Sequence, residues 1–386
     1  MTTSEGLHAL EPEWKALAER CGEGLPFHTW EWADAWWRCF REDSFAVRDR
    51  LALRAVRTAQ SGELVAVAPL MEVHRPGLGL PAFRGLEFLG ADPNVTEVSG
   101  VLADPRFLAQ AYEALGEHLL ERADEWDWVA WRGVPDDGAA LNRCGEWGST
   151  LPGRLMGYRL RLEGTWEQFR ASRPRNLKES LRKCANSLRR DGLRAELEAL
   201  RRPADVAAGL GHFLGLHRAR AQAKDLAPHP DVFCDPASRA FLREACASLA
   251  SRDAVRLFQL RIGGEVVAAR LAFVVGSTLY LYFSGFDPAW ARYSVASSVT
   301  AGAVQHAFSE RLAFVHLSTG TDPSKLRWRP EPVCWRAGLQ LSPRASSGAK
   351  RAVLELLLGE RTEPLRKLIG HVLGRKRSAP SQIEAA

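Results

Sequence analysis

The stretch from Val255 to Trp328 constrains the fold of this chain more than any other. Its first part contains three runs rich in β-branched and aromatic residues, Val255–Arg261, Glu265–Val275 and Thr278–Phe286, separated by Gly263-Gly264 and Gly276-Ser277. Short turns between such runs predict β-hairpins. A helical pattern over Ser294–Phe308 and a further strand, Leu312–Ser318, follow. Strand, helix and strand in this order predict a parallel crossover.

The helix predicted to begin at Ser294 is a candidate anion site. First-turn N–H groups have no partner within a helix and lie at the positive end of its dipole, so they bind phosphate groups that can approach the backbone closely. Side chains at this start are small, namely Ser294, Ala296, Ser297 and Ser298. We expect the backbone N–H groups of Val295 to Ser298 to hold the phosphates of a cofactor.

Length and composition limit the class of protein. A chain of 386 residues is too long for one ordinary core, which predicts two domains. No apolar run is long enough to span a bilayer, and the acidic N-terminal segment does not resemble a signal peptide. The seven cysteines are scattered, without a C-x-x-C pair or any spacing of metal ligands. We therefore expect a cytoplasmic protein with reduced thiols, no membrane span and no metal site.

Basic residues gather in one segment. The net charge of +6 favours anionic ligands such as nucleotides or phosphorylated carriers. Within this balance, Trp166–Arg190 is predicted to form one long helix with a buried stripe of Leu177, Leu181, Cys184 and Leu188, and a basic stripe of Arg175, Lys178, Arg182 and Arg189. A solvated face would explain the basic stripe, and so would an anionic partner.

Tryptophans crowd the segment after Thr29. Thr29 is a predicted helix N-cap, and Trp32, Trp36 and Phe40 recur at helical spacing, which predicts one buried stripe. Trp37 lies off this stripe. It is a candidate substrate-binding residue, as part of an aromatic wall for an acyl chain or a sugar ring.

The order of predicted elements repeats along the chain. A hairpin formed by Leu51–Arg57 and Leu64–His74 contains Gly62-Glu63, as the later hairpin contains Gly264-Glu265, and a helix followed by a strand comes after each. This repetition predicts an internal duplication. We expect an N-terminal supporting domain over residues 1–152, a C-terminal chemical domain over 153–342, and a helical, partly disordered tail over 343–386.

Several short motifs together resemble a known family. They are Arg-Pro-Arg-Asn at 173–176, the GEVVAA strand, the run YLYFSGFDP, Tyr293-Ser294, and G-x-D-x-x-K-x-R-W ending at Trp328. This set resembles the GNAT-fold acyltransferases of the CelD-like type from cellulose and exopolysaccharide biosynthesis, which are related to the Fem-type aminoacyl transferases. The resemblance extends over roughly Phe27 to Val333. Many members have Pro-Gly after Tyr-Ser, where this chain has Val295-Ala296.

The resemblance implies an α/β (α+β) fold of tandem GNAT-like domains, each with a mixed twisted sheet flanked by helices. It also implies an N-acyltransferase that uses acetyl-CoA or acyl-CoA as co-substrate and an amine or amino sugar as acceptor. Matching positions give candidate substrate-binding residues at Arg173, Arg175, Asn176, Lys325 and Trp328. Arg327 is a further candidate, since with Lys325 it could bind a phosphate or a substrate carboxylate.

Acyl transfer to an amine requires a base for the amine and an acid for the leaving thiolate. Tyr282 and Tyr293 are candidate acids, with a packed core tyrosine as the alternative for each. Asp287 and His217 are candidate bases. Because Asp287 and Asp322 precede prolines, a helix N-cap is the favoured interpretation of both. In the central strand, Leu279, Leu281 and Phe283 are predicted to face one side, and Tyr280, Tyr282 and Ser284 the other.

Two further functions remain open at this point. A Fem-like enzyme would take its acyl group from aminoacyl-tRNA, which suits a basic helix, and an acyl carrier protein is another anionic donor. A degenerate, non-catalytic subunit of polysaccharide production is the other alternative. Stabilisation by coenzyme A would separate the first function from these two.

Overall fold

The computed structural model describes residues 1–45, 47–75, 83–92, 95–136, 138–223 and 229–344, together with the short strand β15 (Glu384–Ala385). Over these residues the chain divides into two compact units. Unit 1 contains Met1–Cys21, Phe27–Leu155 and the chain from Cys334 onward, and unit 2 contains Gly22–Pro26 and Met156–Val333. The helix predicted at Arg351–Leu373 lies outside the described residues.

Unit 1 is built around a mixed sheet. Its helical elements are α1 (Ser4–Ala9), α2 (Glu11–Arg20), α3 (Trp30–Phe40), η2 (Pro105–Phe107), α4 (Leu108–Glu121) and α5 (Ala139–Glu146). The short helix η1 (Pro26–His28) precedes α3. Its strands are β1 (Arg48–Leu51), β2 (Arg54–Arg57), β3 (Leu64–Ala68), β4 (Leu70–Arg75), β5 (Phe83–Phe88), β6 (Leu102–Ala103), β7 (Trp128–Pro135) and β14 (Glu331–Leu341). The larger sheet has the order β1-β4-β5-β7-β14, and β2-β3-β6 form a smaller one.

The tryptophan stripe of α3 is core, as predicted. The Thr29 hydroxyl accepts a hydrogen bond from Trp32 N at 3.3 Å and begins the helix. Trp32, Trp36 and Phe40 are all buried. Both indoles also bond polar partners, since Trp32 Nε1 donates to Thr96 Oγ1 at 3.0 Å and Trp36 Nε1 donates to Asp92 Oδ2 at 2.9 Å. A buried indole N–H needs such a partner.

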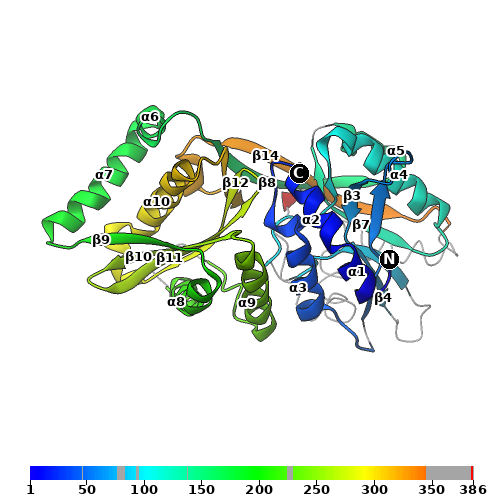
Figure 1. Cartoon of the computed structure of the whole chain (residues 1–386), viewed down its shortest axis with the longest axis horizontal. Helices are drawn as coiled ribbons and strands as arrows, with labels where there is room; N and C mark the ends of the chain where they lie inside the picture. Colours follow the sequence, from blue (N-terminus) through cyan, green and yellow to red (C-terminus); the bar gives the residue numbers. More distant parts are fainter. Residues whose placement is uncertain are drawn as a thin grey trace. The chain divides into compact units, whose positions relative to one another are not determined.

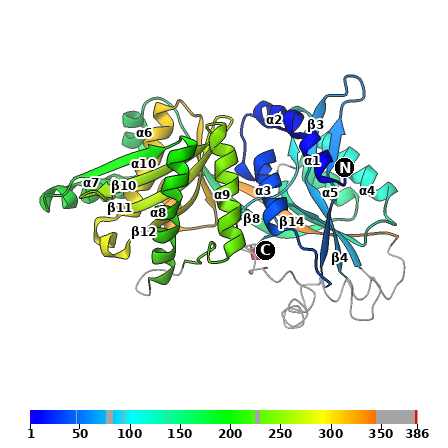
Figure 2. The same ribbon diagram turned by 60° about the horizontal axis from the view of Figure 1, so that its bottom comes forward.

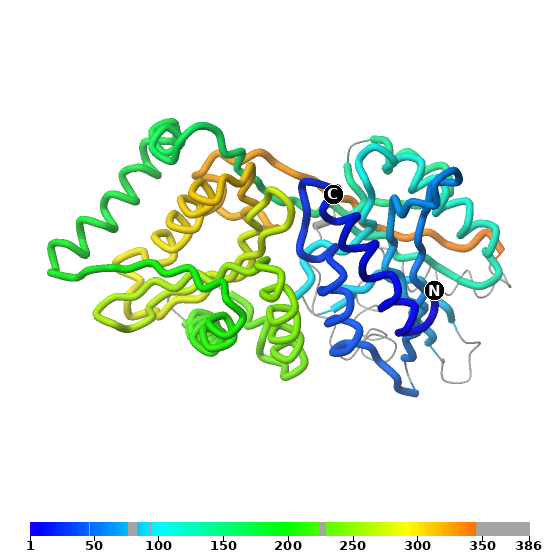
Figure 3. Tube along the Cα trace, in the orientation of Figure 1, coloured from blue at the N-terminus to red at the C-terminus, as the bar shows by residue number. Residues whose placement is uncertain are grey.

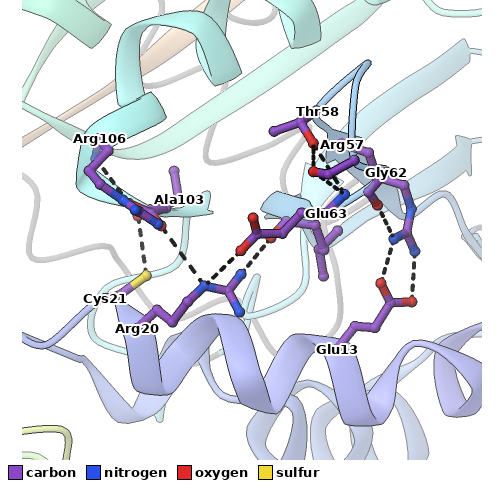
Figure 4. Close-up of polar contacts among 12 residues, drawn as sticks. Glu13, Arg20, Cys21, Arg57, Thr58, Gly62, Glu63, Ala103 and Arg106 are labelled. Carbon is purple, nitrogen blue, oxygen red and sulfur yellow. Dashed lines mark hydrogen bonds and ion pairs between the residues drawn. The ribbon is translucent and has the colours of Figure 1, made fainter.

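The turn at Gly62 is held against helix α2 by ion pairs (Figure 4). The Arg57 guanidinium pairs with Glu13 of α2 and donates to the Gly62 carbonyl at 3.0 Å. Arg20, at the end of α2, lies 3.4 Å from the Glu63 carboxylate. These contacts join the hairpin formed by β2 and β3 to the N-terminal helices.

Unit 2 contains a mixed set of strands from the large sheet, with helices on both faces (Figure 1). Its helical elements are α6 (Trp166–Ser172), α7 (Arg175–Arg190), α8 (Pro203–Gln222), α9 (Pro236–Ser251), η3 (Pro288–Tyr293), α10 (Val295–Ser309) and α11 (Pro323–Leu326). Its strands are β9 (Ala195–Leu200), β10 (Val255–Ile262), β11 (Glu265–Val275), β12 (Thr278–Phe286) and β13 (Phe314–Thr319), and β8 (Thr150–Arg161) enters from unit 1. The order is β8-β13-β12-β11-β10-β9.

Two layers of helices cover the strands of unit 2. Figure 1 shows α7 and α10 on one face of strands β10 to β12 and α8 and α9 on the other. In Figure 2 the layer of α8 and α9 has come forward over the strands. The core beneath α10 contains Leu279 and Leu281 of β12 together with Val295, Val299 and Ala303 of α10. The strand face predicted to be apolar at these two leucines therefore packs against α10.

The duplication predicted from the sequence is visible in the topology of the two units. In unit 1, β1 pairs with β4 and β2 pairs with β3, and the turn containing Gly62 joins β2 to β3. In unit 2, β10 pairs with β11 across Gly263-Gly264. Each hairpin continues into an antiparallel strand, a crossover helix and a parallel strand: β5, α4 and β7 in unit 1, and β12, α10 and β13 in unit 2. The Gly62 turn joins β2 to β3 of the three-stranded sheet, whereas Gly263-Gly264 joins β10 to β11 of the large sheet, so the equivalence of the two turns stays a prediction.

One helix prediction was wrong. The segment predicted as a single helix over Trp166–Arg190 consists of α6 and α7, separated by Arg173 and Pro174 (Figure 3). Arg173 has an extended backbone, with φ −72° and ψ 157°. The ring of a proline disfavours the helical conformation of the residue before it, so α6 ends there. The elements that were not predicted include strands β5, β6, β9 and β14 and helices α1 and α5.

Candidate functional site

The central feature of unit 2 is an opening between parallel strands β12 and β13. Their ladder joins only Thr278–Tyr280 to Phe314–His316. Beyond Tyr280, β12 continues to Phe286 beside β11, while β13 continues to Thr319 beside β8. The later part of β12 therefore presents backbone N–H and C=O groups along an edge that β13 does not pair. Such an edge can bind an extended ligand by strand-type hydrogen bonds.

A β-bulge lies where the strands separate. The register of β12 against β11 shifts between the pair Leu281–Ala272 and the pair Ser284–Arg270, so Tyr282 and Phe283 both lie opposite Leu271. The bulge turns two consecutive side chains to one face. Accordingly the Tyr282 and Phe283 rings contact each other, with centroids 4.4 Å apart, and both contact Phe233. The strict alternation predicted for this strand was therefore wrong at Phe283 and, beyond the bulge, at Ser284.

The start of α10 lies at the end of this strand, as the crossover predicts. Ser294 is the N-cap residue, with a left-handed backbone (φ 54°, ψ 41°) and no capping hydrogen bond from its side chain. Val295 is buried, whereas Ala296, Ser297 and Ser298 are partly exposed. Arg327 donates from Nη2 to Ser297 Oγ at 2.7 Å. A guanidinium thus lies beside the positive end of the helix, which is favourable for an anion.

The G-x-D-x-x-K-x-R-W turn, residues 320–328, contacts the start of α10 through Arg327. Asp322 caps α11 by accepting from Ser324 N at 2.7 Å, which confirms the N-cap interpretation. The Lys325 ammonium donates to the carbonyls of Thr319 and Gly320 at the end of β13. Trp328 is buried in the core of unit 2. Lys325 and Trp328 therefore fix the turn that carries Arg327.

Arg173 belongs to the same neighbourhood. Its Nη1 donates to the Trp328 carbonyl at 2.9 Å, and its guanidinium lies over the Phe169 ring, 4.3 Å from the centroid. Partial burial, followed by the positive charge of Arg329, lowers the pKa of Arg173 from its usual value. Arg173, Arg327 and the start of α10 are thus joined through one short turn.

Helix α7 presents its basic residues to solvent. Arg175 pairs with Glu179 at 2.6 Å and its side chain is 88% exposed, and Asn176 Oδ1 accepts from Leu177 N at 2.8 Å. Arg182, Lys183 and Arg189 are exposed too. Leu177, Cys184 and Leu188 are buried, which confirms most of the predicted apolar stripe, while Leu181 is partly buried.

Tyr293 and Asp287 both make structural contacts. The Tyr293 hydroxyl donates to Asp191 Oδ2 at 2.8 Å, and this bond is the main reason that the pKa of Tyr293 is raised. To protonate a thiolate, the phenol would first have to leave Asp191. Asp287 accepts from Ala289 N at 3.0 Å as the N-cap of η3, as the favoured interpretation predicted.

His217 and Tyr282 lie together on the α8 face of the bulge. The His217 side chain is fully buried, and its Nδ1 lies 3.1 Å from the Ser284 carbonyl oxygen. Burial lowers the pKa of His217, so the imidazole is neutral near pH 7. Tyr282, also buried, contacts Phe233 and Phe273 by edge-to-face rings.

One residue beside the opening was missed by sequence reasoning. His316 of β13 stacks on Tyr280 of β12, with ring centroids 4.7 Å apart, at the last pair of the parallel ladder. Its Nδ1 accepts from Ser318 N at 3.1 Å, and burial lowers the pKa of His316 to about 3. The alternation of the strand around His316 was a signal that could have assigned it to the same face as Tyr280.

Trp37 lies in unit 1, buried in α3, with the Arg41 guanidinium 5.8 Å from its ring centroid. The other predicted site residues all belong to unit 2. Over the ranges described above, no group of three or more His, Cys, Asp or Glu side chains converges as metal ligands. Among the helices placed by the structure, none has the length and apolar character needed to cross a membrane.

Comparison with known proteins matches this architecture. A crystal structure of FemX aligns with a TM-score of 0.62 and 10% identity over 90% of this chain and 98% of that chain. The C-terminal domain of a putative lysylphosphatidylglycerol synthetase from Agrobacterium fabrum gives 0.49 and 13% over 92% and 98%. A tandem GNAT protein from the clavulanic acid biosynthesis pathway gives 0.44 and 10% over 89% and 98%.

The sequence itself is matched by a family model over part of its length. No curated protein matches the chain in sequence. Residues 175–326 match the model of the acetyltransferase (GNAT) domain, and these residues contain the bulge, the opening between β12 and β13, and the start of α10. The predicted fold of mixed sheets flanked by helices is confirmed. The match of residues 175–326 to a GNAT-type acetyltransferase domain supports an acyltransferase.

Proposed function

We propose that unit 2 transfers an acyl group from the thioester of acyl-CoA to an amine. The observation that carries this proposal is the combination of the β12 edge beyond the end of its ladder with β13, the start of α10 and Arg327. The first offers strand-type hydrogen bonds to the amides of a pantetheine arm. The second offers the N–H groups of Val295 and Ala296 and the Arg327 guanidinium to the pyrophosphate, since Ser297 N and Ser298 N already donate to the Ser294 carbonyl.

The reaction needs little beyond positioning and charge stabilisation. The amine nitrogen attacks the thioester carbon, the C–N bond forms, and the C–S bond breaks with release of the coenzyme A thiolate. One proton leaves the amine and one joins the thiolate. A backbone N–H on the open edge of β12 would stabilise the oxyanion that forms on the carbonyl. Tyr282 is the proposed acid, since the Tyr293 hydroxyl already donates to Asp191.

The acceptor is proposed from the finer resemblance of the motifs. The CelD-like type implies an amino sugar or a related amine in exopolysaccharide production. Arg173 and Arg175 are proposed to contact an acidic acceptor or the phosphates of the donor. A screen of acyl-CoA thioesters against amines and amino sugars, with release of free thiol as the readout, identifies both substrates.

A matched pair of variants tests the cofactor site. Ala296→Glu places negative charge and bulk in the first turn of α10, where Ala296 is partly exposed, and is expected to abolish binding of coenzyme A. The helix itself should survive, because acidic residues are favourable in a first turn. Ser297→Ala removes one hydrogen bond, that from Arg327, and should cost about 0.5–1.5 kcal/mol of binding.

The two variants are compared by calorimetric titration with coenzyme A and by thermal melting. Normal binding by Ala296→Glu, or binding lost only with the fold, would place the phosphates elsewhere. Failure of the wild-type protein to bind any acyl-CoA would overturn the proposal itself.

Transfer from aminoacyl-tRNA is the second candidate function, favoured by one observation. Arg182, Lys183 and Arg189 lie exposed along α7, beside the GNAT core, and a row of cations suits a nucleic-acid backbone. Transfer of a labelled amino acid from charged tRNA, together with no stabilisation by coenzyme A, would favour this function. Absence of both activities would favour a non-catalytic role in polysaccharide production.

A further inference from the structure

Beyond the bulge, the backbone N–H and C=O groups of β12 point alternately toward β11 and away from it. Asp287 N donates to Val267 O at 2.9 Å. Since hydrogen-bonded and non-hydrogen-bonded pairs alternate in an antiparallel ladder, the pair Gly285–Ala269 is hydrogen-bonded and the pair Ser284–Arg270 is not. The N–H and C=O groups of Ser284 therefore point away from β11, toward the edge that β13 leaves unpaired.

His217 forms a hydrogen bond with the Ser284 carbonyl oxygen on this edge. A carbonyl oxygen can only accept, so the 3.1 Å contact is a hydrogen bond when the imidazole carries its proton on Nδ1. The Pro230 backbone, which offers only a carbonyl, also lies close to the ring, but among the described residues Nε2 has no partner in hydrogen-bonding geometry. The Asp231 carboxylate lies 4.0 Å from Nε2, which is too long for a hydrogen bond. Arg218 lies 3.8 Å from the same Asp231 carboxylate, and His229 contacts the His217 ring edge-on at 5.0 Å.

The position of His217 is fixed by close packing of α8 on β12. A Cβ at Gly285 would lie 2.2 Å from His217 N and 2.4 Å from the Leu216 carbonyl carbon, so only glycine permits this approach of helix to strand. The imidazole is enclosed by aromatic rings, with Phe233 at 5.1 Å and Phe283 at 5.6 Å. A fully buried imidazole held on both sides has little freedom to move away from the carbonyl.

We infer that His217 is a positioning residue, which ties down the Ser284 carbonyl and thereby directs the neighbouring Ser284 N–H into the opening as the donor to the thioester oxygen. This inference rests on the acyl-transfer function proposed above. It replaces the role of general base considered for His217 from its residue type, because an Nδ1 proton bound to a carbonyl and an enclosed Nε2 leave no route for a proton from the amine.

The arrangement also explains why a carbonyl oxygen on this edge would not oppose catalysis. An unbonded carbonyl beside a forming oxyanion would repel it. With the His217 N–H bound to its oxygen, the Ser284 carbonyl presents less negative charge to the opening, and the N–H of the same residue remains as the donor.

The test uses the full-length protein and three variants. His217→Leu removes the donor and keeps the apolar volume. His217→Asn retains an amide N–H close to the position of Nδ1. His212→Leu, on the exposed face of the same helix, is the matched control. Each is followed by amide hydrogen exchange over residues 281–287 and by steady-state acyl transfer from acetyl-CoA to the amine accepted by the wild type.

The expected result is a split between binding and turnover. His217→Leu should lower kcat about tenfold to a hundredfold, less than the loss seen when an oxyanion donor is removed outright, with KM for acetyl-CoA changed less than threefold. It should also speed exchange over residues 281–287. His217→Asn should recover most of the kcat and most of the protection from amide exchange. His212→Leu should change neither kcat nor exchange.

Two results would overturn the inference. The first is a His217→Leu variant whose kcat and amide exchange over residues 281–287 are the same as in the wild type. The second is a His217→Asn variant that loses as much kcat as His217→Leu, which would indicate that His217 acts through packing alone. A wild-type protein without acyl transfer from acetyl-CoA to any amine refutes the proposed function instead. The exchange comparison then still decides whether His217 holds the bulge.

Discussion

Gly285→Ala is expected to separate α8 from β12 and to destabilise the protein by about 2 kcal/mol. The new methyl group would meet backbone atoms, His217 N at 2.2 Å and the Leu216 carbonyl carbon at 2.4 Å. Helix backbone cannot rotate out of the way, so α8 has to shift as a body. Overpacking of this kind costs about 1–3 kcal/mol, and the smaller entropy of the unfolded chain returns only about 0.4–1 kcal/mol.

Gly302→Ala is the matched control for this prediction. Its Cβ would also meet an atom at 2.2 Å, but that atom is Leu197 Cδ2, the end of a side chain that is 40% exposed. Leu197 can change rotamer at little cost. Because alanine is about 0.8–1 kcal/mol better than glycine inside a helix, Gly302→Ala should be neutral or slightly stabilising.

Urea unfolding of the two variants, followed by circular dichroism, measures the difference in the free energy of unfolding. We expect about 2–3 kcal/mol between them, with coenzyme A binding weakened in Gly285→Ala alone. Equal destabilisation by both variants would refute the reasoning, since it would mean that the distance alone, and not the kind of atom met, sets the cost.

Three further outcomes are expected. Charge reversal at Arg182 and Arg189 of α7 should weaken binding of an anionic partner such as tRNA in a filter-binding assay, and more at low salt, where screening is least; unchanged affinity at every salt concentration would indicate a merely solvated face. Arg327→Ala should lower the affinity for coenzyme A in calorimetric titration by roughly tenfold to a hundredfold, the worth of a charged hydrogen bond. Burial lowers the pKa of His28 to about 4 and that of His316 to about 3. Because the unfolded chain takes up these protons first, stability should fall as the pH drops from about 6.5 toward 4, by up to about 1.4 kcal/mol per pH unit for each histidine, and thermal melts of His316→Gln should show a smaller slope.

Periodic patterns in the sequence predicted the elements that carry the site. The glycine turns between β10, β11 and β12, the apolar stripe of α3 and the crossover through α10 follow from local rules, and the structure has them. The N-caps at Asp287 and Asp322 also follow from an acidic residue before proline. Local rules suffice here because each feature depends on residues that are close in sequence.

Features that depend on distant strands could not be predicted in this way. The bulge at Tyr282 and Phe283 arises from the register of β12 against β11 and has no mark in the residues themselves. The bond between Arg327 and Ser297 joins residues thirty positions apart. The end of the parallel ladder at Tyr280 depends on the path of β13. Pro174, by contrast, was a local signal, and applying the rule for residues before proline would have divided α6 from α7.

The residue before the first turn of α10 has an unusual backbone. Ser294 is left-handed, at φ 54°, a conformation that only glycine adopts freely. A non-glycine residue in this region costs of order 1–2 kcal/mol, and such strain persists where the surroundings fix it. Here the surroundings are η3 on one side, held through the bond from Tyr293 to Asp191, and the buried Val295 on the other.

The consequence of this strain concerns the first-turn N–H groups. An N-cap serine in the usual extended conformation would return its hydroxyl to the backbone of the first turn. In the left-handed conformation the Ser294 side chain makes no such bond. The Ser294 carbonyl accepts from Ser297 N at 2.9 Å and from Ser298 N at 3.2 Å, so of the four predicted donors the N–H groups of Val295 and Ala296 are those left to face a ligand. The small side chains of Ala296 and Ser297 then permit an anion to approach, and Arg327 adds its charge from the turn after β13. Tyr293, predicted as a catalytic acid, would thus support the proposed cofactor site indirectly, because its bond to Asp191 holds the residue before Ser294 in place.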